Sequence, residues 1–387
     1  MSRPLRTFLL PALLCFVLAG QACVRGDEPR SPFVEAVLDP IWKSDNLREP
    51  ILFLKQTDAS PTGQLLFPVV ELERVESATR EVTFEEGKDY VWDSETQTFS
   101  LPEGSRIPFL TEEQLHPLMT SDTPKIGKPG APKDEGRGIY FDNKDGYHQM
   151  QVEAIYQPAS DSWKGPVPQY ASEKLPTVTT KLKASEPVRI FLLGDSISEG
   201  YNASAFSQAK PNCPAYGELF AETLAAATDS KIDFRNFAVG GWQASQGVNR
   251  VREEKLAEEK PDLVIIAFGM NDVWQKNAAA FKTNTQAIIE AFREQNEKTE
   301  FILVSTMLGN REWGMPMEEF DRYRTALEEL TGPGIALADL TAVWEIFLER
   351  KTFYDLTGNG VNHPNDFGHI VYAQWIARML LDDAAYQ

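Results

Sequence analysis

Short hydrophobic runs, many of them alternating with polar residues, dominate the first part of the chain. Runs of this kind, bounded by turn residues, predict β-strands. They lie at residues 51–54, 65–70, 81–84, 90–92, 98–101 and 149–156. Turn-forming sequences separate them, such as ASPTG at 59–63 and EEGKD at 85–89. We therefore predict a small β-rich domain, a sandwich or a jelly roll, over residues 31–156.

The hydrophobic pattern changes after residue 187. Mostly apolar runs predict buried strands at 188–193, 233–239, 262–268, 300–306 and 335–338. Between and after them, helical stretches lie at 216–227, 247–259, 278–296, 317–330 and 365–381. Alternating strands and helices indicate a parallel sheet that is covered by helices on both faces. The pattern thus predicts an α/β domain over residues 188–387, with a three-layer, flavodoxin-like, doubly wound sheet.

Two stretches lack a regular pattern. Residues 120–138 are rich in Pro, Gly, Lys and Asp and predict a long surface loop. Residues 157–187 contain five prolines, at 158, 166, 168, 176 and 187, and we interpret them as the linker between the two domains.

The first 22 residues have the pattern of an export signal. Arg3 and Arg6 precede an apolar run of residues 7–20, and GQA at 20–22 offers small residues for cleavage. The run is too short to span a bilayer comfortably. We expect residues 1–22 to be a cleaved signal peptide, with no membrane insertion afterwards and a periplasmic or extracellular location. Cys23 leaves a lipid-anchored form as the alternative.

Charge and cysteine content narrow the classes of partner. The formal net charge of −19 repels phosphate backbones, so we expect no nucleic-acid partner. A neutral small-molecule or polysaccharide substrate suits such a surface better. We find no metal-type Cys/His spacing and no phosphate-binding glycine loop, and we expect neither a metal nor a cofactor. The mature chain keeps at most Cys23 and Cys213, which make no disulfide framework.

Polar residues follow three of the predicted strands, at the sheet edge where α/β domains bind ligands. GDSISEG at 194–200 places Ser196 at a tight turn from strand to helix. NFAVGG at 236–241 ends in two glycines, and AFGMND at 267–272 contains Asn271, an amide that can donate to an oxyanion. Helix capping by Ser196 or Asn271 and an ordinary turn at Gly241 are the alternatives. We assign Asp195 a structural role, which is to hold the turn at Ser196.

A histidine precedes the final predicted helix, in the sequence GNGVNHPND at 358–366. Pro364 favours an extended conformation at His363 and can start a helix, so the imidazole is expected on a loop. Of the three other histidines, His116 and His148 belong to the β-rich region, and His369 lies within the helix.

These four blocks, in this order, resemble the GDSL/SGNH serine hydrolase superfamily over about 200 residues. The resemblance implies Ser196 as nucleophile and His363 as base. It implies an oxyanion hole made of the Ser196 backbone, the Gly241 backbone and the Asn271 side chain.

One position departs from the family pattern. The family usually has an Asp three residues before the His, where this chain has Gly360. A Ser–His pair can still work if another group orients the imidazole. The candidates are Asp355, Asp366, Asn362 and a backbone carbonyl.

The sequence therefore predicts a carboxylic ester hydrolase. It resembles secreted carbohydrate acetylesterases, which implies hydrolysis of short acetyl esters, with a polysaccharide as the expected substrate. A lipid esterase or lysophospholipase is one alternative. A carbohydrate-binding protein that retains the fold without catalysis is the other, because the Asp before His363 is missing.

Overall fold

A computed structural model describes residues 23–24, 31–56 and 59–386. The predicted signal peptide, residues 1–22, lies outside these ranges. Across the described ranges, no helix is both long enough and apolar enough to cross a membrane.

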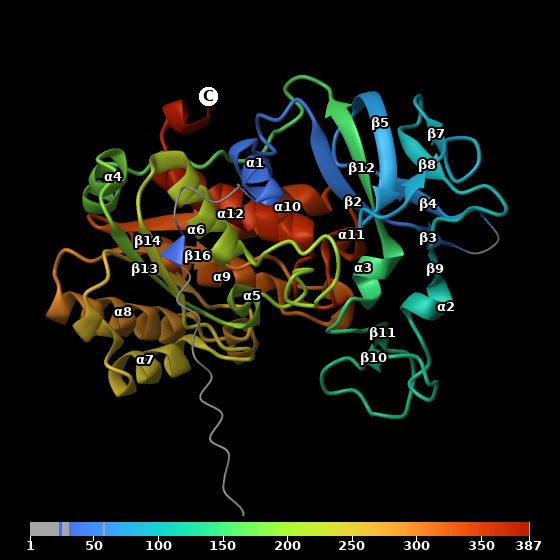
Figure 1. Cartoon of the computed structure of the whole chain (residues 1–387). Helices are drawn as coiled ribbons and strands as arrows, with labels where there is room; N and C mark the ends of the chain where they lie inside the picture. The colour runs from blue at the N-terminus through green and yellow to red at the C-terminus, as the bar shows by residue number, and fades with distance from the viewer. Residues whose placement is uncertain (1–22, 25–30, 57–58, 387) are drawn as a thin grey trace, which may run out of the picture.

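A mostly parallel sheet forms the centre of the C-terminal half (Figure 1). Its parallel strands are β13 (Val188–Gly194), β14 (Ile232–Asn236), β15 (Leu263–Ala267), β16 (Glu300–Ser305) and β17 (Ile335–Asp339). The order across the sheet is β14-β13-β15-β16-β17, and β1 (Cys23–Val24) pairs antiparallel with β14 at one edge. Runs of Val, Ile, Leu and Phe form these strands because both faces of the sheet are covered. The predicted parallel sheet is confirmed.

Helices lie on both sides of this sheet (Figure 1). On one side, α7 (Ala244–Glu253), α8 (Ala278–Gln295) and α9 (Met317–Glu328) pack in sequence. On the other side lie α1 (Pro32–Leu38), α4 (Pro176–Lys183), α6 (Tyr216–Thr228) and α12 (Asp366–Leu380). The remaining helical segments are α5 (Ser196–Glu199), α10 (Leu340–Leu348), α11 (Phe353–Leu356), η1 (Leu256–Glu259), η2 (Asp272–Gln275), η3 (Arg311–Trp313) and η4 (Asp383–Tyr386).

The N-terminal part is rich in strands, as predicted. One antiparallel sheet contains β2 (Leu47–Leu52), β12 (Gln151–Pro158), β5 (Val69–Ser77) and β6 (Thr83–Phe84), in this order. A second sheet contains β7 (Val91–Asp93), β8 (Thr98–Ser100), β4 (Thr62–Gln64), β3 (Leu54–Lys55) and β9 (Leu110–Thr111). The ribbon of β10 (Lys125–Ile126) and β11 (Ile139–Tyr140) and the helices α2 (Glu112–Leu115) and α3 (Gly146–Met150) complete this part.

The structure differs from the predicted elements in the N-terminal part. The strand expected at 65–70 begins only at Val69 and continues to Ser77. Charged residues such as Arg74 and Glu76 interrupt the apolar pattern of this strand in the sequence. In the structure these two side chains form an ion pair along the strand. The stretch interpreted as a linker contains α4, whose Val178 and Leu182 are buried. The proposed domain boundaries remain predictions.

Candidate active site

The turn after β13 carries the first of the predicted site residues. Ser196 opens the short helix α5, directly after the sheet strand, and only 5% of its surface is exposed. The Asp195 carboxylate accepts a hydrogen bond from the Ile197 N–H at 3.1 Å. This bond caps the helix and holds the turn, which is the structural role expected for Asp195.

His363 meets Ser196 at this turn. The distance from His363 Nε2 to Ser196 Oγ is 2.9 Å, although 167 residues separate the two in sequence. The loop that carries His363 is closed by a bridge between Thr357 and Pro364, and the His363 carbonyl accepts bonds from Gly358 N and Thr357 Oγ1. The fold therefore brings together the two side chains that the sequence singled out.

The other ring nitrogen of His363 contacts two asparagines. Its Nδ1 lies 2.8 Å from Asn202 Oδ1 and 2.9 Å from Asn359 Nδ2. Neither residue was among the predicted orienting groups. Asn359 stands four residues before His363, which is a signal that the sequence offered, whereas Asn202 reaches the site only through the tertiary fold.

The candidates named from the sequence bond to other groups. Asp355 accepts from Leu52 N, and Asp366 accepts from Ser204 N. Asn362 Oδ1 accepts from the Asn359 amide. Among the residues that the structure describes, none of the four candidates, the backbone carbonyl included, is the group that contacts the imidazole Nδ1, whose hydrogen-bond contacts are with the side-chain amides of Asn202 and Asn359.

Burial sets the protonation state of the site. It lowers the pKa of His363 to about 3, with a smaller contribution from the charge of His369. The imidazole is thus neutral at pH 7 and can accept a proton. Burial also raises the pKa of Asp195 to about 7 and that of Asp272 to about 6.

Gly241 and Asn271 lie on the loops that follow β14 and β15. Gly241 has a φ of +78°, a left-handed conformation that glycine adopts without strain. The Asn271 side-chain amide donates to the backbone carbonyl of Trp242 at 3.0 Å. Gln243 Nε2 donates to the backbone carbonyl of Asn271 at 3.2 Å. These bonds connect the loops after β14 and β15, since Trp242 and Gln243 directly follow Gly241.

The other histidines have structural partners. His116 contacts Glu112 and Glu312, each at 2.8 Å, and His148 Nε2 donates to the Lys210 carbonyl. His369 lies fully buried in α12. Within the described ranges, no group of three or more His, Cys, Asp or Glu side chains could hold a metal ion.

Comparison with known proteins gives a family match for the region that carries the site. Residues 192–371 match the GDSL-like Lipase/Acylhydrolase family. No curated protein sequence matches the chain.

Similar solved structures include a two-domain esterase (CEX) active on acetylated mannans, co-crystallized with mannopentaose. It is 22% identical, with a TM-score of 0.44 over 57% of this chain and 56% of that chain, so the match spans little more than half of that esterase. Another is Axe2, an acetylxylan esterase from Geobacillus stearothermophilus, at 19% identity and a TM-score of 0.41, covering 52% of this chain and 97% of that one. A lipase/acylhydrolase from Enterococcus faecalis is 23% identical, with a TM-score of 0.41 over 49% of this chain and 94% of that one.

Proposed function

We infer that this chain, a carboxylic ester hydrolase whose residues 192–371 form a GDSL-like lipase/acylhydrolase domain, uses Ser196 as nucleophile and His363 as general base. The observation that carries this proposal is the contact of 2.9 Å between His363 Nε2 and Ser196 Oγ. A nucleophile and its base need a hydrogen bond of this length. Burial lowers the pKa of His363 and so keeps its imidazole neutral at pH 7, the protonation state that a general base needs before the reaction.

The proposed reaction is a two-step acyl transfer. Ser196 Oγ forms a bond to the ester carbonyl carbon while His363 takes its proton. The tetrahedral oxyanion is bound by the backbone N–H groups of Ser196 and Gly241 and by the Asn271 amide. His363 then protonates the leaving alcohol, and water attacks the acyl-enzyme to release the acid. Removing one oxyanion donor is expected to raise the barrier by about 3–4 kcal/mol.

For the substrate, we favour short acetyl esters on a polysaccharide. Phe206 is 42% exposed, and its ring lies 4.7 Å from the Tyr201 ring, which in turn lies 5.2 Å from the His363 ring. An exposed aromatic face beside the base can stack on the apolar face of a sugar ring. The net charge of −19 also suits a neutral polymer. Lipid esters are the alternative substrate, and hydrolysis of lysolipids alone would favour them.

The finer features of fold and location are part of the same proposal. The strand order β14-β13-β15-β16-β17 supports a flavodoxin-like class for the sheet. We regard the two N-terminal sheets as a small β-sandwich domain. Export remains proposed from the sequence of residues 1–22, with lipidation of Cys23 as the variant form.

Hydrolysis of p-nitrophenyl acetate by matched serine and histidine variants tests the catalytic assignment. Ser196→Ala and His363→Ala are each expected to lower kcat by about 10⁴-fold or more while the circular dichroism spectrum stays unchanged. Ser94→Ala is the matched control, because Ser94 is exposed and lies between β7 and β8, outside the contacts of His363. Turnover by Ser196→Ala at the wild-type rate would overturn the assignment. Acetate release from acetylated xylan and mannan, compared with fatty-acid release from lysolipid, tests the substrate class.

A further inference from the structure

The N-terminal region fills the space where the family's Asp would stand. Gly360 has a φ of +84°, and a Cβ added there would lie 2.4 Å from Tyr147 Oη and 2.5 Å from the Tyr140 carbonyl oxygen. Both neighbours belong to the segment 140–148, which is part of the N-terminal region. An aspartate at position 360 would therefore clash with these neighbours.

The amide of Asn202 has only one favourable orientation. Its Nδ2 donates to the carbonyls of Lys144 and Gly358, each at 3.0 Å. Both amide hydrogens are thus used, and Oδ1 must face His363 Nδ1 at 2.8 Å. The Nδ1 atom then carries the hydrogen and donates a hydrogen bond to Asn202 Oδ1. The Nε2 atom, which faces Ser196, is left unprotonated.

The second asparagine beside the imidazole has a different role. Asn359 Oδ1 accepts from the backbone N–H groups of residues 361, 362 and 363. Its Nδ2 donates to Asn362 Oδ1 at 3.1 Å and to Asn143 Oδ1 at 3.3 Å. Asn359 therefore shapes the loop, and the nitrogen that it places beside His363 Nδ1 is no hydrogen-bond acceptor.

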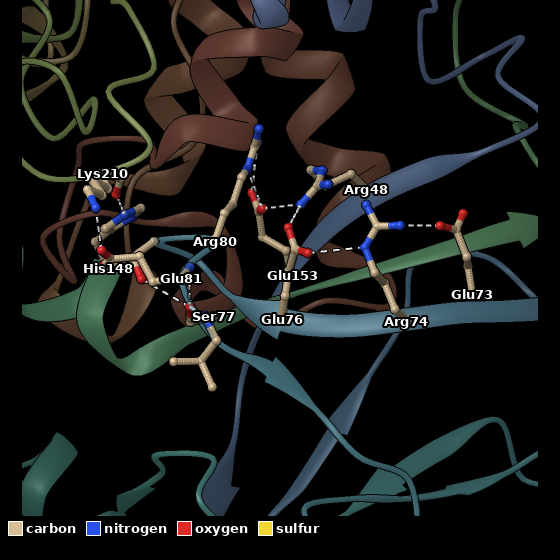
Figure 2. A network of polar contacts seen from close by, with 12 residues as sticks. Arg48, Glu73, Arg74, Glu76, Ser77, Arg80, Glu81, His148, Glu153 and Lys210 are labelled. Atoms are coloured by element: carbon tan, nitrogen blue, oxygen red, sulfur yellow. Dashed lines mark hydrogen bonds and ion pairs between the residues drawn. The ribbon is translucent and has the colours of Figure 1, made fainter.

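The segment that carries Asn202 is itself held by the N-terminal region. His148 Nε2 donates to the Lys210 carbonyl at 2.6 Å, and the Lys210 ammonium pairs with Glu81 at 2.5 Å (Figure 2). Ser207 Oγ donates to the same Lys144 carbonyl that accepts from Asn202. In this way α3 and the loops of the N-terminal sheets fix both ends of the 202–210 segment.

We propose that Asn202 is the positioning residue for His363, and that the segment 140–148 completes the active site by fixing the Asn202 amide through the Lys144 carbonyl. This proposal rests on the proposed role of His363 as the base. The N-terminal region is accordingly part of the catalytic machinery. A neutral amide selects the tautomer as the family's aspartate does, but it adds no charge to stabilise the imidazolium.

Replacement of Asn202 by alanine should change the tautomer of His363. In Asn202→Ala, the Asn359 amide becomes the polar group beside Nδ1, and it can only donate. The preferred tautomer should then change to Nε2–H, which cannot accept the serine proton. We expect kcat to fall by about 100-fold or more with little change in KM.

Asn202→Asp tests the same point from the opposite side. It keeps an acceptor toward Nδ1 and adds a negative charge beside the imidazole. The titratable groups that face His363 are His369 of α12 and Tyr201 of the segment after α5. Because neither is a carboxylate, the new carboxylate should raise the pKa of His363 and move the acidic limb of kcat/KM to higher pH by about one unit or more.

The experiment combines ¹⁵N NMR of histidine-labelled full-length protein with pH–rate profiles. The chain has four histidines, and His363→Ala assigns the signal of interest. Wild type and the control Ser94→Ala should show the Nδ1–H tautomer at neutral pH, and Asn202→Ala the Nε2–H tautomer. Retention of Nδ1–H in Asn202→Ala, or an acidic limb of Asn202→Asp at the wild-type pH, would overturn the proposal. If Asn202→Asp does not fold, the tautomer of Asn202→Ala alone decides.

The two proposals fail in different ways. If wild type hydrolyses no ester, the proposed function is wrong, yet the ¹⁵N spectrum still reports whether Asn202 sets the tautomer. If wild type is active and the tautomer does not depend on Asn202, only the positioning role is wrong.

Discussion

At the scale of single residues, Gly360 stands where the GDSL/SGNH superfamily, which this chain resembles, usually has an aspartate. Restoring it by Gly360→Asp should lower the free energy of unfolding by about 3 kcal/mol or more, since a side chain there combines left-handed strain with a clash against Tyr147 and Tyr140. Urea denaturation followed by circular dichroism measures the change. Gly332→Asp is the matched control, because an added Cβ there meets no described atom within 4 Å. Equal loss of stability in both variants would contradict this account.

The pH profile of the wild-type enzyme depends on the burial of His363. Its pKa is lowered to about 3, so the base is neutral over the whole range above that value. We therefore expect His363 to stay unprotonated between about pH 5 and pH 7.5, and any change of kcat/KM for p-nitrophenyl acetate in this window to come from Asp195 or Asp272, whose pKa values burial raises to about 7 and about 6. Protonation of the His363 ring near pH 6.5, the ordinary value for histidine, detected by ¹⁵N NMR, would show that the imidazole is solvated.

The sequence was sufficient to single out Ser196 and His363, but not the side chains that contact the His363 imidazole. Both sit in short motifs at element boundaries, where local patterns are informative. Asn202 lies 161 residues from His363 and reaches it only when the N-terminal region packs against the sheet. The candidates drawn from the sequence were chosen for nearness along the chain, and tertiary packing placed them elsewhere.

At the scale of elements, the loop that carries His363 is attached to the N-terminal sheet through Gln151. Gln151 Nε2 donates to the carbonyls of Tyr354, Asp355 and Thr357, and its Oε1 accepts from Asn365. These bonds link the start of β12 to both sides of the loop. We therefore expect a substitution at position 151 to affect both stability and activity.

Gln151→Leu should lower the free energy of unfolding by about 2 kcal/mol, because it leaves buried carbonyls without donors. It should also lower kcat, since the loop before His363 loses its anchor. Chemical denaturation and steady-state kinetics measure the two effects. Gln149→Leu, at an exposed position nearby, should stay within about 0.5 kcal/mol of wild type. A destabilised Gln151→Leu with unchanged kcat would show that the anchor does not serve catalysis.

Prediction of elements from the sequence succeeded where the hydrophobic pattern was continuous. The parallel strands β13 to β17 and the helices α6, α8, α9 and α12 lie close to their expected positions. Short helices such as α3 and α11 were not predicted, because a single turn has no periodicity to detect. The strand β5 was predicted at the wrong residues because its charged side chains interrupt the apolar pattern. In the structure they form ion pairs across and along the sheet.

At the scale of the whole molecule, the two parts of the chain share buried contacts. The Lys351 ammonium, 1% exposed, donates to Glu49 Oε1 at 3.0 Å and to the carbonyls of Pro50 and Gln64. A buried charge of this kind is stable only with its partners, so the C-terminal half depends on the N-terminal sheet. No local pattern in the sequence could show this dependence, because each half contributes one side of the contact.

We expect Ser196 to be an activated nucleophile in the folded protein. Reaction with a fluorophosphonate, followed by intact-mass and tandem mass spectrometry, tests it most directly. We predict one phosphonyl group per chain, attached to Ser196, and no labelling of the His363→Ala variant on the same time scale. Folded wild-type protein that stays unlabelled, or that is labelled at another serine, would contradict the account.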